Sequence, residues 1–437
     1  MVACRFLLLS ALLLVPFSSV AARDDDSNTV EVAILDVLLE RGIIDAATYD
    51  ELMALAQAES QRAHDMDLLE SRMQRMKAPE IKVTGGKPGK FLLESEDGSW
   101  SMGFKGRLQV QVDVTDGESG NREADETNYS VRRGRLALFG KAGGENLTYK
   151  VEVDVPTQNS ANRDKKDFSL TDAWLNWKVG ENLDVKAGQH KVPFGREVQF
   201  ASSKLDTVSV SAATKEFTPD REPGLSVYGS TPDKFVQWWA MSSNGEGTGN
   251  SNKSGKDGSG ASGLRSAARI VFNPLGELKK NGAAFQTVDD GGLKVAFGAS
   301  VMHNADEAQD VDGDGTAGDG RSNDTSVGLE LQVLAGPVSF LTESFKRSAD
   351  VSGGSDIDDD GYNAQVGVFV VPNEIELVAR RSEVDYDVDP DRTETTFGAV
   401  FYRDGHNSKF SLEATNVHID GPANDEMVYR GQYQIIF

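Results

Sequence analysis

Arginine and lysine residues alternate with apolar residues in several stretches of this chain, and that spacing suits the binding of anions. In residues 104–113, FKGRLQVQVD, one set of alternate positions holds apolar residues and a glycine, and Lys105 and Arg107 belong to the other set. Successive side chains of a β-strand point to opposite faces of a sheet. The basic residues would therefore share a polar face, where positive charge attracts anions and arginine can donate two parallel hydrogen bonds to a phosphate.

The same rule applied along the chain predicts a larger basic face. The candidate anion-contacting residues are Lys105, Arg107, Arg133, Arg135, Lys150, Arg265 and Arg269. Further cations expected on this face are Lys186, Lys294, Arg380, Lys409 and Arg430. Nearly as many carboxylates fall on it, among them Glu152, Asp172 and Glu330. Each cation therefore has two open roles, because it either contacts ions or forms an ion pair that braces the wall.

Catalysis finds little support in the sequence. The chain has five histidines, and neither an HExxH nor a GxSxG spacing lies near them. The formal net charge of −24 also argues against nucleic acid as a partner. We therefore do not expect an enzyme or a nucleic-acid-binding protein.

Two acidic segments imitate the first half of a calcium-binding loop, with carboxylates at positions 1, 3 and 5 and glycine at position 6. They are Asp310, Asp312, Asp314 with Gly315, and Asp356, Asp358, Asp360 with Gly361. Position 12 holds Arg321 and Gly367 in place of the bidentate glutamate. We expect no metal site and no cofactor, and weak calcium binding by external loops stays open.

The first 22 residues have the pattern of a secretory signal peptide. Arg5 precedes an apolar run from Phe6 to Phe17, and residues 20–22, VAA, fit a small-residue cleavage site. The only cysteine, Cys4, lies inside this segment, so the exported chain has no disulfide to stabilise it. A closed barrel would supply that stability through its complete ladder of hydrogen bonds.

Residues 23–99 are expected to form a periplasmic helical segment and a linker. Helical character extends over residues 28–77, with a stop at Gly42 and a helix cap at Asp45. A 3,4-spaced apolar seam then includes Leu52, Leu55, Met66, Leu69, Met73 and Met76, with polar residues at two of its positions. The seam allows either a short coiled coil or a helix that lies on its own barrel.

Residues 100–437 are expected to form a transmembrane β-barrel of about 16 antiparallel strands. Two-residue alternation recurs in this region, and short turns such as 142–146 and 335–337 alternate with eight long polar loops. The turn at residues 273–292 is longer than this scheme predicts. The chain ends in Phe437, on one face with Tyr433 and Ile435, and so resembles outer-membrane proteins whose terminal strand is recognised by the barrel-assembly machinery.

Three segments resemble the phosphate-selective porin family, porins O and P. They are residues 132–140, RRGRLALFG, residues 172–175, DAWL, and residues 188–197, GQHKVPFGRE. The resemblance implies a homotrimeric channel in the Gram-negative outer membrane, in contact with lipid and lipopolysaccharide, through which small anions or hydrophilic solutes diffuse. It makes Arg133 and Arg135 the preferred candidates for ion contact.

The resemblance also implies that the third long loop, residues 190–222, folds inward and narrows the pore. Its basic residues are Lys191, Arg196, Lys204, Lys215 and Arg221. An ordinary external loop is the alternative. Other open readings of the whole chain are a cation-preferring porin, a non-conducting structural or adhesive barrel, and a soluble secreted β-sandwich.

Overall fold

The computed structural model describes most of the chain in two compact units, Met1–Pro79 and Glu80–Phe437. The described residues are 27–75, 81–85, 91–119, 122–123, 126–155, 158–159, 162–165, 168–245, 247–248, 263–305, 321–351, 356–421 and 425–437. The signal peptide predicted at residues 1–22 and the acidic segment with Asp310, Asp312 and Asp314 lie outside them, so both stay predictions.

The first unit contains two helices, α2 (Ser27–Glu40) and α3 (Ala46–Arg75). Gly42 adopts a positive φ of 69° between them, and the Asp45 carboxylate accepts a hydrogen bond from the Thr48 backbone N–H at 2.7 Å. The predicted helix stop and helix cap are thus confirmed. Within the described residues, no helix has the length and apolar character needed to cross a membrane.

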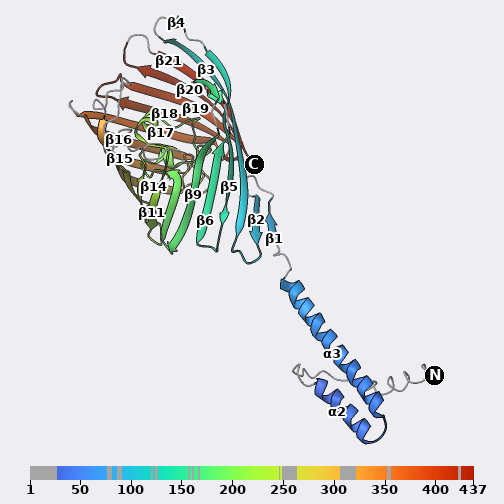
Figure 1. Ribbon diagram of the computed structural model, residues 1–437. Coiled ribbons are helices and arrows are strands. Elements are labelled where there is room, and N and C mark those ends of the chain that lie inside the picture. The colour runs from blue at the N-terminus through green and yellow to red at the C-terminus, as the bar shows by residue number, and fades with distance from the viewer. Residues whose placement is uncertain are drawn as a thin grey trace. The chain divides into compact units, whose positions relative to one another are not determined.

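The second unit is a closed barrel of sixteen antiparallel strands, as predicted (Figure 1). The barrel strands are β3 (Ser101–Ser119), β5 (Glu126–Lys141), β6 (Leu147–Asp154), β9 (Ser169–Gly180), β10 (Leu183–Lys191), β11 (Arg221–Ser230), β12 (Val236–Ser243), β13 (Arg265–Phe272), β14 (Leu293–Ala305), β15 (Arg321–Ala335), β16 (Val338–Val351), β17 (Ile357–Val371), β18 (Ile375–Asp385), β19 (Arg392–Asp404), β20 (Ser408–Ile419) and β21 (Asp425–Ile436).

The smaller strands lie outside this ring. β4 (Arg122–Glu123) extends a loop hairpin from β3, and β7 (Gln158–Asn159) pairs with β8 (Asn162–Lys165). β1 (Ile81–Thr84) and β2 (Phe91–Ser95), expected as part of a linker, instead continue the sheet at the start of β3. The sheet therefore begins before residue 100.

The ring closes between β21 and β3. Backbone pairing extends along both strands, and Gln109 donates to Gln434 at 2.7 Å while Gln432 donates to Gln111 at 2.8 Å on the inner face. Phe437 exchanges backbone hydrogen bonds with Gly106, and its ring lies over that glycine. Closure leaves the ring with no unpaired edge, which a membrane-spanning sheet requires.

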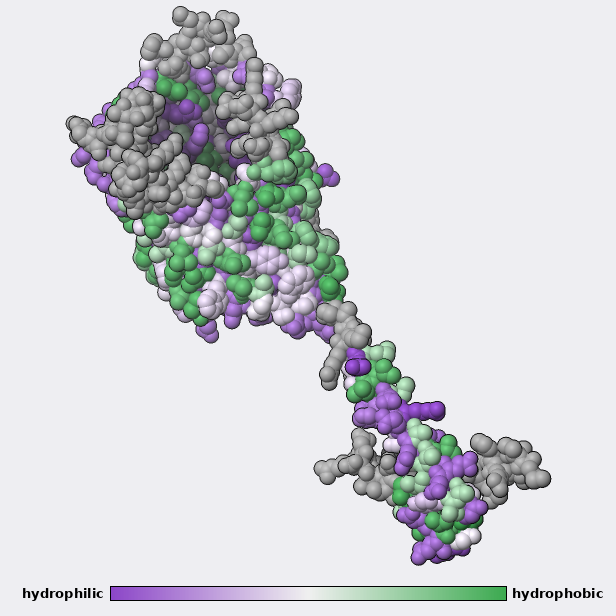
Figure 2. Space-filling model, viewed as in Figure 1, coloured by the Kyte–Doolittle hydropathy of each residue, from purple (hydrophilic) through white to green (hydrophobic). Residues whose placement is uncertain are grey.

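The alternation of faces is as predicted. Phe104, Leu108 and Val110 are exposed on the outside, while Arg107 and Gln109 point inward and are buried. Figure 2 shows hydrophobic residues gathered over the outer wall of the barrel. An apolar outer band of this kind matches the hydrocarbon of a bilayer.

A β-bulge in β5 breaks the alternation next to the predicted basic residues. Gln109 pairs with Arg133 and Val110 pairs with Val131, so Arg132 is the extra residue on β5. Inward-facing residues of β5 therefore have even numbers before the bulge and odd numbers after it. Arg132 lies at the change, and the charges acting on it include Asp113 and Asp154. Arg132, which strict alternation assigns to lipid, thus lies among the inward-pointing charges.

The acidic segment 356–361 lies mostly within a strand and not in a loop. β17 begins at Ile357, and its extended backbone sends Asp358 and Asp360 to one face and buries Asp359 on the other. An extended strand cannot gather successive carboxylates around one ion, because calcium needs six to eight oxygens at about 2.3–2.6 Å. The described residues contain no group of three metal-binding side chains.

Candidate functional site

The segment between β10 and β11, residues 192–220, lies inside the barrel, and we call it the inner loop. It contains a 3-10 turn, η1 (Glu197–Gln199), and a short helix, α4 (Ala212–Phe217). Its apolar residues Val192, Phe194 and Phe217 pack with Phe345 of the wall. The loop is therefore held by a small hydrophobic core within the lumen.

Buried carboxylates of the wall hold the backbone of the inner loop. Glu343 on β16 accepts hydrogen bonds from the backbone N–H groups of Arg196 and Glu197, and Glu413 on β20 accepts from that of Val208 at 2.9 Å. Backbone N–H groups bound to a carboxylate form charge-assisted hydrogen bonds, which are stronger than neutral ones.

A cluster of two arginines and one glutamate forms a second anchor. Glu330 on β15 lies 3.4 Å from Arg196 of the inner loop and 2.6 Å from Arg269 of β13. Arg196 also donates to Gln332 at 2.6 Å, and Arg269 stacks on Trp239 at 5.0 Å. Both guanidinium groups are buried, so these two predicted residues support the wall in this structure.

The inner loop thus covers the acidic part of the wall. The carboxylates Glu330, Glu343, Asp359, Glu376 and Glu413, carried by β15 to β20, are all buried. Each is held by hydrogen bonds or ion pairs to the loop or to neighbouring side chains. Water that enters the barrel is therefore shielded from their negative charge.

The long turn between β13 and β14, residues 273–292, also folds into the barrel, and we call it the inner turn. Leu278, Ala283 and Ala284 are buried in a second hydrophobic cluster with wall residues. The Gly282 backbone N–H donates to the Lys204 carbonyl at 3.3 Å, so the inner turn meets the inner loop. The length that disagreed with the turn pattern thus reflects a segment that fills part of the lumen.

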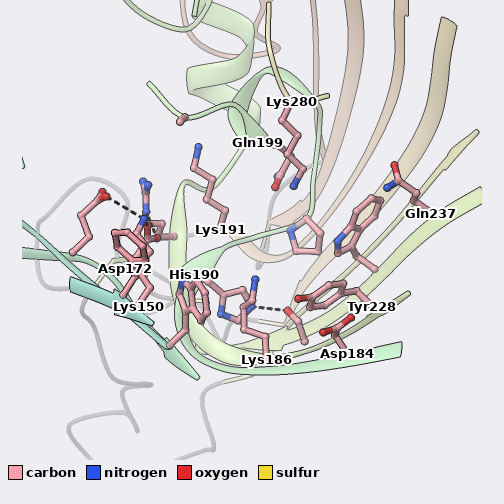
Figure 3. A pocket seen from close by; sticks show the side chains of 18 of the residues that line it. Lys150, Asp172, Asp184, Lys186, His190, Lys191, Gln199, Tyr228, Gln237 and Lys280 are labelled. Carbon is pink, nitrogen blue, oxygen red and sulfur yellow. Dashed lines mark hydrogen bonds and ion pairs between the residues drawn. The ribbon is translucent and has the colours of Figure 1, made fainter. Parts of the chain in front are cut away.

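A cavity of about 560 Å³ remains on the opposite side, against β3 to β12. Figure 3 shows it from close by. Among the described residues, nine lysines and arginines line it, against four acidic residues. The cations are Lys105, Arg107, Arg135, Lys150, Lys186, Lys191, Arg221, Lys234 and Lys280. The open side of the lumen is therefore basic.

Several of these cations are paired. Arg135 contacts Glu152 at 3.3 Å and Asp154 at 2.9 Å. Asp172 accepts from Lys150 at 2.5 Å and from Arg221 at 2.8 Å. These ion pairs join neighbouring strands, which is the bracing role that the sequence left open.

Four other cations of the cavity have neither an ion pair nor a side-chain hydrogen bond within the described part of the chain. They are Lys105, Arg107, Lys186 and Lys280. Lys191 and Lys234 also have no ion pair there, but they donate hydrogen bonds to oxygen atoms of the chain. Lys105 is exposed to the lumen, and the charges acting on it include Lys150 and Lys204. These side chains leave positive charge available to a passing anion.

The remaining predicted residues are distributed as follows. Arg133 donates to Gln109 at 3.1 Å, and Arg265 forms an ion pair with Glu222. Lys191 donates to the carbonyl groups of Val198 and Phe200 and so fixes the start of the inner loop, while the Lys204 and Lys215 side chains are exposed.

Two inward-facing cations escaped the sequence reasoning. Lys280 lines the cavity but comes from a turn that the barrel pattern keeps outside the lumen. The inward position of Arg132 depends on a bulge. The aromatic residues Trp174, Tyr228 and Trp239 also line the cavity. Alternation within residues 236–243, VQWWAMSS, was a usable signal for Trp239, because it separates two adjacent tryptophans onto opposite faces.

Comparison with known proteins agrees with this geometry. The model of the phosphate-selective porin O and P family matches residues 104–420. The chain belongs to the phosphate-selective porin O and P family. The porin is thus an outer-membrane channel of Gram-negative bacteria, and family and fold favour a channel over an enzyme.

Solved structures share the porin fold at low sequence identity. An anion-selective porin from Comamonas acidovorans has a TM-score of 0.54 at 12% identity, covering 77% of this porin and 100% of that chain. DcaP, an outer-membrane channel of Acinetobacter baumannii, has a TM-score of 0.53 at 13% identity, and the match covers 79% of this porin and 99% of that chain. The trimer form of OmpT from Vibrio cholerae has a TM-score of 0.50 at 13% identity, and the match covers 78% of this porin and 100% of that chain. No curated protein sequence matches.

Proposed function

We propose that this porin conducts anions in preference to cations and that the basic side of its lumen sets the preference. The observation that carries the proposal is the unequal division of charge. Among the residues that the structure describes, the wall carboxylates Glu330, Glu343, Asp359, Glu376 and Glu413 are buried, while nine cations and four acidic residues line the cavity. Fixed charge that lines a narrow aqueous path lowers the barrier for ions of the opposite sign.

The constriction in this proposal lies between the inner loop and β3 to β6. Lys105 of the wall feels the positive charge of two other lysines, Lys150 of the wall and Lys204 of the loop. An anion that passes this point would meet cations from both sides. Since Arg135 and Lys150 are partly neutralised by carboxylates, we expect a moderate preference for anions, including phosphate.

The test is the reversal potential of the purified porin in a planar bilayer under a potassium chloride gradient. We expect a potential of the sign that chloride permeability produces, and a second measurement with phosphate would rank the two anions. A reversal potential of the opposite sign would contradict the proposal and favour a cation-preferring porin. An absence of channels at protein levels that give normal insertion would favour a structural barrel.

We also propose a homotrimer whose helical segment associates as a coiled coil in the periplasm. The trimer form of OmpT supports the assembly state, and the exposed Leu55, Met66, Leu69 and Met73 of α3 offer an apolar seam. Barrel-assembly machinery and lipopolysaccharide are the further partners that this location would bring. Removal of residues 27–75 should weaken the trimer on unheated electrophoresis, and an unchanged trimer would contradict the coiled coil.

A further inference from the structure

Three aromatic side chains point into the cavity, and we call them the aromatic cluster: Trp174 on β9, Tyr228 on β11 and Trp239 on β12. Tyr228 and Trp239 are direct cross-strand partners. Directly opposed residues have Cβ atoms about 4.5–5.5 Å apart, so the two side chains start side by side on the inner wall. Aromatic residues of outer-membrane barrels normally gather in girdles on the lipid side. The membrane therefore does not account for this cluster.

Cations lie against these rings. The Lys186 Nζ atom is 4.7 Å from the centroid of Trp174 and 5.0 Å from that of Tyr228. The Lys280 Nζ atom is 5.5 Å from the centroid of Trp239, on which the paired Arg269 also stacks at 5.0 Å. In the described part of the chain neither lysine has an ion pair. Figure 3 shows Lys186 beside Tyr228 and Lys280 across the cavity from them. Positive charge and flat apolar surface thus occur together.

We propose that the aromatic cluster and its two lysines bind aromatic carboxylates, which are planar rings that bear a carboxylate group. The inference rests on the anion preference proposed above and deepens it. An inorganic anion would use the lysines and gain nothing from the rings, whereas an aromatic ring stacks on Trp and Tyr while its carboxylate meets Lys186 or Lys280. The volume of about 560 Å³ lies in the usual range for small-molecule sites.

The first experiment compares two probes on the unmodified porin. Benzoate and cyclohexanecarboxylate carry one carboxylate on a six-membered ring, and benzoate alone is aromatic. Added to a single channel in potassium chloride, benzoate should block with a residence time about 2- to 10-fold longer, the range that aromatic stacking supplies. Equal residence times would overturn the proposal. A neutral sugar that blocks as long as benzoate would also overturn it, because the site would then not select negative charge.

The second experiment uses two adjacent tryptophans. Trp239→Leu removes a ring of the cluster and should abolish most of the difference between the probes, whereas Trp238→Leu changes a lipid-facing neighbour and should preserve it. Lys186→Met should shorten both residence times, because both probes carry the carboxylate. Equal effects of the two tryptophan substitutions would overturn the proposal.

The two proposals fail in different ways. A potassium-selective reversal potential in potassium chloride alone would refute the anion preference, on which this inference rests. A chloride-selective potential with equal residence times for the two probes would refute the aromatic site alone.

Discussion

Replacement of Lys105 by methionine should weaken the preference for chloride over potassium about fourfold. Lys105 is exposed to the lumen and has no ion pair among the described residues. A unit charge about 5 Å from an ion contributes about 0.8 kcal/mol in water, and screening over about 8 Å leaves roughly half. The charge stabilises chloride and destabilises potassium by this amount. Its removal therefore changes the free-energy difference between the two ions by about 0.8 kcal/mol, which corresponds to about a fourfold change in their permeability ratio.

The measurement is the reversal potential of each variant under the same potassium chloride gradient. Lys346→Met is the matched control, because it removes the same charge from the outer face of β16, where Lys346 lies 3.6 Å from Asp358. We expect the control to match the unmodified porin. If Lys105→Met folds and its permeability ratio equals that of the control, fixed charge at this position does not set selectivity and the electrostatic reasoning is wrong.

Three further substitutions test the architecture. Glu343→Leu should release the inner loop and raise single-channel conductance, since each buried N–H group that loses its acceptor costs about 1–3 kcal/mol. The control Ser344→Leu, on the lipid side, should leave conductance unchanged. Equal conductances of these two variants would contradict the anchoring role of Glu343. Gly282→Val should raise the noise of the open-channel current, because a Cβ at this position of the inner turn would lie 2.3 Å from the Asp206 carboxylate of the inner loop. Noise equal to that of the unmodified porin would show that the inner turn does not support the inner loop. Gly106→Val should reduce the heat-modifiable barrel on electrophoresis, because its Cβ would lie 2.3 Å from the terminal phenylalanine ring; a normal yield would argue against that contact.

Local pattern was sufficient to predict much of the barrel. Alternation in the first strand assigned Lys105, Arg107 and Leu108 to the faces that they occupy, because the side-chain period of a strand is fixed by its backbone. The succession of short turns and long loops gave the strand number for a related reason, since each membrane crossing needs a strand of similar length.

Pairing between distant residues could not be predicted in this way. Arg196 and Glu330 are separated by 134 positions and meet only because the inner loop crosses the lumen. Nothing in the local sequence of Lys280 distinguishes a turn that enters the barrel from one that stays outside. Which cations remain available for anions therefore depends on tertiary contacts, and the bulge at Arg132 shows that one extra residue is enough to change an assignment.

The eccentric position of the inner loop divides the circumference of the barrel into two regions that should tolerate change differently. Residues on β15 to β20, such as Glu343 and Glu330, are tied to the loop, so their substitution alters the shape of the whole passage. Residues on β9 to β12 that face the cavity, such as Lys186 and Tyr228, line its surface and have no hydrogen bond or ion pair to the loop among the described residues. Mutational drift could thus adapt the porin to new solutes on one side while the other side preserves its fold.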